Sequence, residues 1–258
     1  GINNTPGSSL SRSTDCGIHL NAGCEFGVAS TKRYTSMIIA LDLFLLLLTQ
    51  DSLSLRDERM KAFEDLSNLP NVVQSMLAQF SAVDKQEDGT ELIGIDKSSE
   101  IVEIAQECIK RKSIIVLGRR IDYATARETA LKIKEITYIY SEGLMSGELK
   151  HGPIALMDEE AFVIFFATDE DGEMFQASLA SLQQIKARGA IVLTIVCADD
   201  VEKVRDFSDK ILVVPRGTQW TQAIINMIPM QILAHEIALI KGLDVDRPRN
   251  LAKCVTVE

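Results

Sequence analysis

The sequence lacks paired cysteines and is short of histidine, which limits the kinds of metal or redox site that it can hold. Its five cysteines are odd in number and scattered, with no Cys-x-x-Cys pair. This usage favours reduced thiols in a cytoplasmic protein over a disulfide framework or a zinc site. The three histidines match no metal-binding spacing, so we expect no metal site.

A net positive charge is also lacking. The formal charge of −10 and the pI near 4.9 argue against a nucleic-acid partner. A phosphorylated substrate would need local hydrogen-bond donors, because the overall field repels it. With 258 residues, 46% of them hydrophobic and 25% charged, the chain has the composition of a soluble globular protein of one large domain or two ordinary ones.

A hydrophobic run of membrane-spanning length is missing from the first half. The segment 37–48 is strongly apolar, but it is too short to cross a bilayer and it contains Asp42. It has neither the N-terminal position nor the basic flank of a signal peptide. We therefore predict a buried core helix here, and no membrane partner.

The second half alternates between strand-like and helix-like segments. Continuous apolar runs predict buried strands at 113–118, 161–167, 190–196 and 210–215. Helical segments are expected at about 123–140, 174–188, 199–207 and 221–241. Strands without polar alternation, separated by helices, indicate an α/β fold in which helices cover both faces of a parallel sheet.

The first half is less regular. Residues 1–35 are rich in Gly, Ser, Thr and Asn, which favours short strands and functional loops, and helices are expected at about 36–50 and 54–80. The polar stretch 84–97 lacks a helical period. We interpret it as a linker or surface insertion, with a domain boundary near it.

One candidate site lies on the helix predicted after the first clear strand. Glu128, Lys132 and Glu135 are spaced i, i+4 and i+7, which places them on one face. Two carboxylates beside an ammonium could exchange protons while the lysine holds an anionic intermediate. A surface salt bridge has the same spacing, so the pattern leaves both interpretations open.

Three other segments carry weaker signals. His151 lies between two possible turn glycines, which could present an imidazole to a cleft. Lys253, near the end, could form a Schiff base with a carbonyl group, although a terminal lysine is ordinarily frayed and solvated. The glycines and hydroxyls of the opening third, with Ser30 and Thr31, are typical of an anion-binding loop.

Taken together, these segments resemble one family. GVASTK-x-YTS, ALKIKEITY, SGELKHGP and the terminal RPRNLAK-x-VTVE occur in this order in glutamine–fructose-6-phosphate aminotransferases, also called glucosamine-6-phosphate synthases. The motifs span most of the chain, and the tail is highly specific. TDCGIHLNAG is more similar to the eukaryotic branch than to the bacterial one.

The resemblance implies an N-terminal glutaminase domain, absent here, followed by two sugar isomerase (SIS) domains, each a parallel α/β sandwich. Residues 1–83 would be the C-terminal part of the first SIS domain, 84–97 the linker or insertion, and 98–258 the second SIS domain with a catalytic tail. The reaction converts fructose 6-phosphate and glutamine to glucosamine 6-phosphate and glutamate. No metal or organic cofactor is implied.

The resemblance also assigns roles to residues. Lys253 would form the Schiff base with the open-chain ketose, and His151, lent by the neighbouring subunit of a homodimer, would open the sugar ring. Glu135 would move the proton between C1 and C2, and Lys132 and Glu128 would assist at the sugar hydroxyls. The sugar pocket would be lined by Val28, Ala29, Ser30 and Ala252.

In eukaryotic relatives the end product UDP-N-acetylglucosamine inhibits the enzyme, and Arg12 and Gly23 match positions linked to that site. The chain departs from the pattern at Arg120, where glycine is expected, and at Arg127 and Thr129 beside the acid–base residues. With the early loops of the first SIS domain absent, we expect the isolated chain to be poorly active. Two alternatives remain: a non-catalytic sugar-phosphate or UDP-N-acetylglucosamine sensor, and a stand-alone SIS isomerase or deglycase.

Overall fold

The computed structural model describes residues 1–85, 91–168 and 172–253, and the chain divides into two compact units. Unit 1 comprises Gly1–Asn68 and Val245–Glu258, and unit 2 comprises Leu69–Asp244. Each unit is described by itself below.

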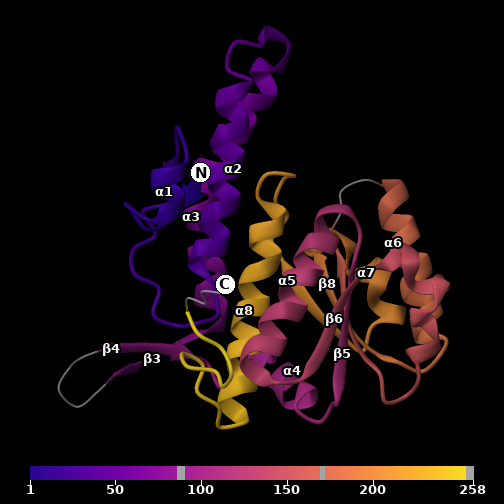
Figure 1. Cartoon of the computed structure of the whole chain (residues 1–258). Helices are drawn as coiled ribbons and strands as arrows, with labels where there is room; N and C mark the ends of the chain where they lie inside the picture. Colours follow the sequence, from indigo (N-terminus) through magenta and orange to yellow (C-terminus); the bar gives the residue numbers. More distant parts are fainter. Residues whose placement is uncertain (86–90, 169–171, 254–258) are drawn as a thin grey trace. The chain divides into compact units, whose positions relative to one another are not determined.

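Unit 2 is built on a five-stranded sheet in which every pairing is parallel (Figure 1). The strand order is β6-β5-β7-β8-β9, so the first strand of the sheet lies between the second and the third. The strands are β5 (Ser113–Gly118), β6 (Tyr140–Met145), β7 (Phe162–Ala167), β8 (Ile191–Cys197) and β9 (Lys210–Val214). The predicted parallel α/β sheet is confirmed, and the four predicted strands are found within a residue or so of their expected limits.

Helices cover both faces of this sheet, as predicted (Figure 1). One face is covered by α4 (Glu100–Cys108), α5 (Arg120–Thr137) and α8 (Gln222–Ile240). The other is covered by α6 (Gly172–Lys186) and α7 (Val201–Val204), which has the short 3-10 turns η4 (Ala198–Asp200) and η5 (Arg205–Phe207) on either side.

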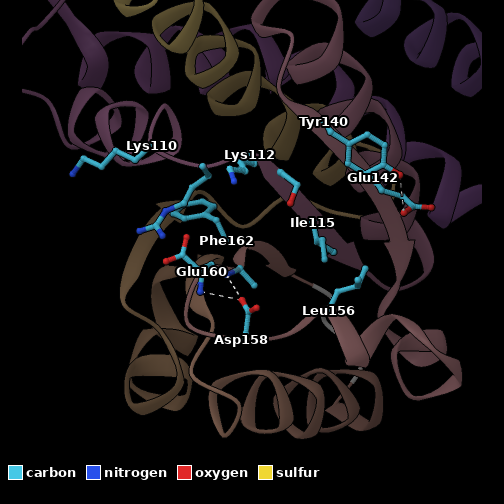
Figure 2. Close-up of a pocket in the computed structure, with 12 residues that line it drawn as sticks. Lys110, Lys112, Ile115, Tyr140, Glu142, Leu156, Asp158, Glu160 and Phe162 are labelled. Carbon is cyan, nitrogen blue, oxygen red and sulfur yellow. Dashed lines mark hydrogen bonds between the residues drawn. The ribbon is translucent and has the colours of Figure 1, made fainter.

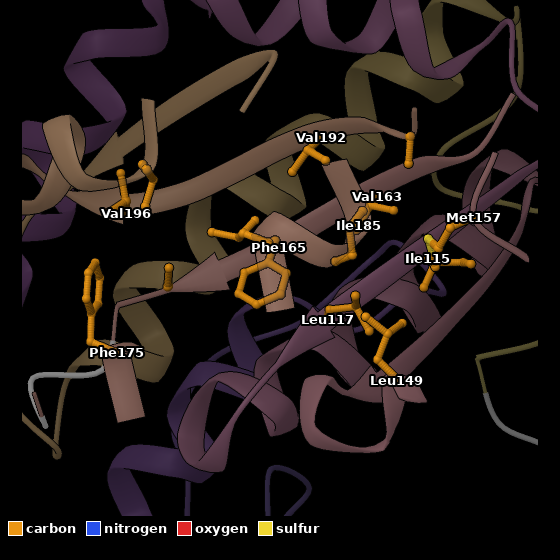
Figure 3. Packing of buried hydrophobic residues seen from close by; sticks show 14 residues of the cluster. Ile115, Leu117, Leu149, Met157, Val163, Phe165, Phe175, Ile185, Val192 and Val196 are labelled. Atoms are coloured by element: carbon orange, nitrogen blue, oxygen red, sulfur yellow. The ribbon is translucent and has the colours of Figure 1, made fainter. Parts of the chain in front are cut away.

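The core explains why the strands are continuously apolar. Leu117 and Phe165 point toward α6, where they join Leu182 in one buried cluster (Figure 3). On β5, Ile114 and Val116 are also fully buried. Because alternate residues of a strand face opposite sides of the sheet, these two lie on the other face from Leu117. Polar alternation is absent because neither face meets water.

A tight turn joins β5 to α5 and fixes the start of that helix. A Cβ atom on Gly118 would lie 2.3 Å from the Asp122 carbonyl oxygen, so this position requires glycine. Arg120 has a φ of 47°, in the left-handed region that favours glycine. The glycine expected at position 120 would adopt this left-handed φ without steric strain. Arginine adopts it at a cost in conformational free energy.

The helix predicted to reach residue 140 ends earlier. Tyr138 takes a left-handed φ of 59° at the C-cap of α5, and the chain then forms strand β6, which the sequence analysis missed. β6 lies at the edge of the sheet, and Tyr140 is 62% exposed. Its sequence, YSEGLM, has polar residues and a glycine in the middle, so it shows no continuous apolar run. Two 3-10 turns follow, η2 (Ser146–His151) and η3 (Pro153–Leu156).

Helix α3 (Arg56–Phe80), with Pro70 inside it, crosses the division between the two units. Strands β3 (Ser81–Lys85) and β4 (Glu91–Ile95) follow it and pair antiparallel, with Ser81 opposite Ile95. The polar stretch expected as a linker or insertion therefore contains β4 and the end of β3. Residues 86–90 lie outside the described part of the chain.

Unit 1 has little regular structure around its helices. Strands β1 (Ile2–Asn3) and β2 (Ile18–His19) form a two-stranded parallel pair, beside the short helix α1 (Ser9–Ser13). Helix α2 (Lys32–Leu48) is followed by η1 (Leu53–Leu55) and the start of α3. The Arg59 guanidinium donates to the carbonyl oxygens of Thr49 and Ser52, at 2.7 and 2.6 Å, and ties α3 to the end of α2.

The prediction that 37–48 is a buried core helix is wrong for this chain. In α2 only Ala40 is buried, whereas Leu41, Phe44 and Leu48 are 55%, 43% and 66% exposed. Besides η1 and the start of α3, unit 1 has only two strands of two residues each and a five-residue helix, and these leave most of α2 uncovered. The helix forms as predicted, but its apolar side chains are not buried.

One helix of the described residues, α8, is long and apolar enough to cross a membrane, with a mean hydropathy of 1.6. However, 61% of its apolar window is buried, which is typical of a core helix, and it packs on α4 and α5.

Candidate functional site

The acid–base cluster predicted on α5 forms a connected group. The Lys132 ammonium lies 2.6 Å from a carboxylate oxygen of Glu135 and 3.3 Å from one of Glu128. The Lys132 side chain is only 5% exposed, and both glutamates are largely covered. The interpretation as a solvated surface salt bridge does not fit this burial. A lysine buried this deeply requires paired carboxylates, and the three groups can hold or exchange a proton.

The substitutions near this cluster face other parts of unit 2. Thr129 is fully buried, and its hydroxyl lies 3.8 Å from the Met227 sulfur in α8. The α-carbon of Arg127 lies so close to β6 that a Cβ atom on Gly143 would be 2.5 Å from it. Thr129 therefore contributes to the packing of α5 on α8, and the close approach at Arg127 involves its backbone, which any residue type shares.

His151 closes η2, after the carboxyl end of β6, and is exposed. Gly152 follows it with a φ of 141°, a conformation that favours glycine. The predicted turn glycine is thus found on the C-terminal side of the histidine, and the imidazole is accessible from outside unit 2.

Lys253 belongs to unit 1, and its amine is bound there. The Nζ atom donates to the Glu25 carboxylate at 2.8 Å and to the carbonyl oxygens of Gly27 and Val28 at 2.6 and 3.5 Å. The backbone N–H of Val28 donates to the Asp246 carbonyl at 3.0 Å, which holds the tail segment against the same loop. The alternative of a frayed terminal lysine therefore fails.

The predicted pocket residues Val28, Ala29 and Ser30 are half-buried in this loop, and Ala252 is exposed beside the lysine. The Ser30 hydroxyl donates to Glu25 at 3.2 Å, and the Thr31 backbone N–H donates to the other oxygen at 2.9 Å. The loop thus gathers the lysine and the predicted sugar-contacting residues in one place within unit 1.

Glu25 is the residue of this group that the sequence analysis missed. Burial raises the pKa of its carboxyl, but hydrogen bonds from Lys253 and from the backbone of Thr31 and Arg33 outweigh that effect and lower the pKa to about 2. The available signal was that Glu25 is the one acidic residue between Asp15 and Asp42, inside the Gly- and Ser-rich loop.

The two residues linked by resemblance to regulation also lie in unit 1. Arg12, in α1, is exposed, and its guanidinium donates to the Gly7 carbonyl. Gly23 has a φ of 69°, and its carbonyl oxygen accepts a hydrogen bond of 2.7 Å from the Asn4 side chain.

The structure divides the predicted site residues between the units. Unit 1 contains Lys253 with its loop, and unit 2 contains the Glu128–Lys132–Glu135 cluster and His151. Within residues 1–85, 91–168 and 172–253, no group of three or more His, Cys, Asp or Glu side chains could hold a metal ion. Burial raises the pKa of Cys108 to about 12 and that of Cys197 to about 11, so both thiols stay protonated at neutral pH.

A pocket of about 420 Å³ lies at the amino-terminal ends of β5, β6 and β7, lined by Ser113, Tyr140 and Phe162 among others (Figure 2). Glu107 forms ion pairs with two of its basic lining residues, Lys110 and Arg111. None of the predicted site residues lines it, and His151 follows the opposite, carboxyl end of β6. This pocket is therefore separate from the predicted chemistry.

The chain is similar over its full length to known aminotransferases. It is 42% identical over 258 residues to glutamine–fructose-6-phosphate aminotransferase (isomerizing) 2 of Mus musculus, and 41% identical over 261 residues to the enzyme of Saccharomyces cerevisiae. All of this chain is covered in both cases. It spans only about a third of each relative's length, 35% and 34%.

Solved structures agree with this similarity. The C-terminal domain of the Francisella tularensis glucosamine–fructose-6-phosphate aminotransferase is 34% identical, with a TM-score of 0.83 over 96% of this chain and 64% of that one. A glucosamine-6-phosphate deaminase from Thermotoga maritima, 19% identical with a TM-score of 0.66, shares the fold. The SIS domain family model matches residues 107–241. Since that match covers more than half of its length, the chain belongs to the SIS domain family.

Proposed function

We propose that this chain is the sugar-isomerising part of an enzyme that makes glucosamine 6-phosphate and glutamate from fructose 6-phosphate and glutamine, in hexosamine biosynthesis. The full-length similarity to enzymes of that name supports this reaction. Because the chain spans about a third of those relatives, a separate glutaminase domain would supply the ammonia. The expected compartment is the cytoplasm.

The observation that carries the proposal is the bound amine of Lys253. Its amine is held 2.8 Å from Glu25, in the loop that contains Val28, Ala29 and Ser30, and this fixed position beside the proposed sugar contacts supports a role as the nucleophile. In the proposed reaction its amine attacks C2 of the open-chain ketose and water leaves. Ala252 and the loop residues 28–30 would contact the sugar.

The proton transfer between C1 and C2 is assigned to Glu135. Its carboxylate is fixed by the 2.6 Å contact with Lys132, and a fixed position is what proton transfer at carbon needs. The charge of Lys132, which Glu128 shares at 3.3 Å, would stabilise negative charge that develops on a sugar oxygen.

His151 is proposed to open the sugar ring in the site of a neighbouring subunit. Its exposure at the end of η2 is compatible with use by a second copy, and the chain would then act as a homodimer or a higher homo-oligomer. UDP-N-acetylglucosamine is proposed as an inhibitor that contacts the region of Arg12 and Gly23.

The direct test is the formation of glucosamine 6-phosphate from ammonia and fructose 6-phosphate. Wild type would be compared with Lys253→Ala and with Lys61→Ala, which removes an exposed lysine of unit 1. We expect a low wild-type rate, no product with Lys253→Ala, and an unchanged rate with Lys61→Ala. Equal rates in all three would remove Lys253 from the mechanism. Binding of fructose 6-phosphate without turnover, in a polypeptide of the length of the relatives, would favour the sensor alternative.

A further inference from the structure

The Glu25 carboxylate uses its two oxygens for different purposes. Oε1 accepts the backbone N–H groups of Thr31 and Arg33, at 2.9 and 3.4 Å, where helix α2 begins. Oε2 accepts the Ser30 hydroxyl at 3.2 Å and the Lys253 ammonium at 2.8 Å. One oxygen caps the helix and the other faces the amine, so the capping contacts hold the second oxygen in a fixed place.

The amine is equally constrained. Its donations to Glu25, to the Gly27 carbonyl and, at 3.5 Å, to the Val28 carbonyl match the three protons of an ammonium group. Of these three acceptors only Glu25 carries a charge. The Glu25 side chain is 4% exposed and the Lys253 side chain 29%, so the carboxylate is shielded from water while the amine can still be reached from solvent.

This carboxylate is unsuited to act as the base that deprotonates the lysine. With a pKa of about 2, it remains an anion at neutral pH and has little affinity for a proton. The carbonyl oxygens of Gly27 and Val28 cannot take the proton either. The role left to Glu25 is a fixed negative charge beside the nitrogen.

We propose that Glu25 is the counter-ion of the Schiff-base nitrogen on Lys253, and that it positions the amine before the sugar binds. This inference rests on the proposed function. When the Lys253 ammonium condenses with the C2 carbonyl, two of its three protons pass to the carbonyl oxygen, which leaves as water, and the third stays on the nitrogen of the positively charged iminium. The adjacent carboxylate stabilises that charge. The iminium can then receive the electron pair of the C1–H bond as the C1 proton leaves.

The other charged groups around the pair stay constant between the variants compared below. The Arg33 Nε atom lies 3.5 Å from Glu25, the Lys32 ammonium donates to the Cys24 carbonyl, and the Asp246 carboxylate lies close to Gly27. Differences in pH dependence between variants at position 25 therefore report the Glu25 charge itself.

The test is reductive trapping with cyanoborohydride, which reduces the protonated imine, with the modified lysine located by peptide mass spectrometry. Fructose 6-phosphate is the first carbonyl probe, and wild type is compared with Glu25→Gln from neutral to alkaline pH. In the variant we expect Lys253 to be trapped about tenfold more slowly at saturating sugar, and the alkaline decline to begin about one pH unit lower. The dissociation constant for the sugar phosphate should stay within about twofold.

Thr35→Ala is the matched control, because it removes a hydroxyl in the first turn of α2 that donates to the Lys32 carbonyl at 3.0 Å and leaves the contacts of Glu25 and Lys253 intact. It should behave as wild type. If Thr35→Ala loses trapping as Glu25→Gln does, or if Glu25→Gln keeps the wild-type pH profile, Glu25 has only a structural role and the inference fails.

A second probe separates this inference from the proposed function. Formaldehyde forms an iminium on Lys253 without any sugar site. If wild type binds fructose 6-phosphate but is not trapped by it on Lys253, the Schiff-base function fails. Trapping by formaldehyde can then still test the role of Glu25. A decline of trapping that begins at lower pH in Glu25→Gln than in wild type supports a counter-ion, and identical pH profiles of the two proteins overturn it.

Discussion

Helices α2 in unit 1 and α8 in unit 2 are both long and apolar, yet their surroundings differ completely. In α8 twelve residues are buried, because the helix packs on α4 and α5 above the sheet. In α2 only Ala40 is buried, because apart from η1 and the start of α3 unit 1 offers only two very short strands and one short helix. Burial of an apolar helix face is favourable, but the face becomes buried only where neighbouring elements pack against it.

The two units therefore differ in how completely their apolar side chains are buried. Unit 2 has a continuous core on both faces of its sheet, whereas unit 1 combines a well-bonded site loop with an uncovered apolar helix. Since the relatives are about three times as long, we expect other polypeptide to cover α2 in a longer protein.

Truncating a leucine should reduce the free energy of unfolding strongly in unit 2 and hardly at all in helix α2 of unit 1. Leu182→Ala, in the buried cluster of unit 2, should reduce the free energy of unfolding by about 2–5 kcal/mol, because it leaves a cavity. Leu48→Ala, in α2, should change it by less than about 0.5 kcal/mol. Urea denaturation followed by circular dichroism measures both. A comparable loss for Leu48→Ala would show that α2 is already covered, for example by self-association, which a dependence on protein concentration would reveal.

The turn after β5 should tolerate no side chain. Gly118→Ala should destabilise unit 2 by about 2–3 kcal/mol, because the new methyl group would overlap the Asp122 carbonyl. Gly172→Ala is the control, since a Cβ atom there meets no atom within 4 Å. Thermal unfolding of both variants makes the comparison, and equal melting temperatures would contradict the close approach.

Two carboxylates of unit 1 should respond to pH in opposite directions. The pKa of Glu25 is lowered from 4.5 to about 2, so its stabilisation is present above pH 4.5 and is lost as the pH falls toward 2. Burial raises the pKa of Asp42 from 3.8 to about 6, so its contribution is present below pH 3.8 and is lost as the pH rises through 6. Each effect should be on the order of 2–3 kcal/mol.

Neutral variants isolate these two effects. Glu25→Gln should flatten the acid limb of the stability profile, and Asp42→Asn should remove the decline between pH 3.8 and about 6. The measurement is the free energy of unfolding across acid pH. A decline near pH 6 that survives in Asp42→Asn would assign it to another group.

The smallest effect is expected at position 120. Arg120→Gly should stabilise unit 2 by about 0.5–1 kcal/mol, because glycine adopts a φ of 47° without steric cost. Thermal unfolding measures the change. Arg119→Gly, at an ordinary φ of −123°, should instead be neutral or destabilising, and a gain there as well would point to a cause other than φ.

The sheet of unit 2 was predictable because its strands carry their signal locally. The runs that became β5, β7, β8 and β9 are apolar on both faces, and a continuous run needs no partner to be recognised. β6, which like β9 lies at an edge of the sheet, was missed because Ser141, Glu142 and Gly143 interrupt its apolar residues. The end of α5 was misplaced because it depends on a left-handed Tyr138, which sequence spacing does not report.

Part of the candidate site could also be predicted from local sequence spacing. The i, i+4, i+7 spacing placed Glu128, Lys132 and Glu135 on one face of a helix, and they are in contact there. That spacing did not reveal the burial of Lys132, which depends on the fold around α5. Glu25 was missed because its partner Lys253 is 228 residues away in the sequence.

Local patterns were enough to find most of the longer helices, the continuously apolar strands and the helix face shared by residues 128, 132 and 135, although helix α4 and strand β6 were missed. Helical and strand periods act over a few residues, so they can be read locally. Only the tertiary structure decided that the apolar α2 is exposed, that Lys132 is buried, and that the amine of Lys253 lies against Glu25. Burial and ion pairing depend on which distant segments meet, and the spacing of residues along the chain does not specify this.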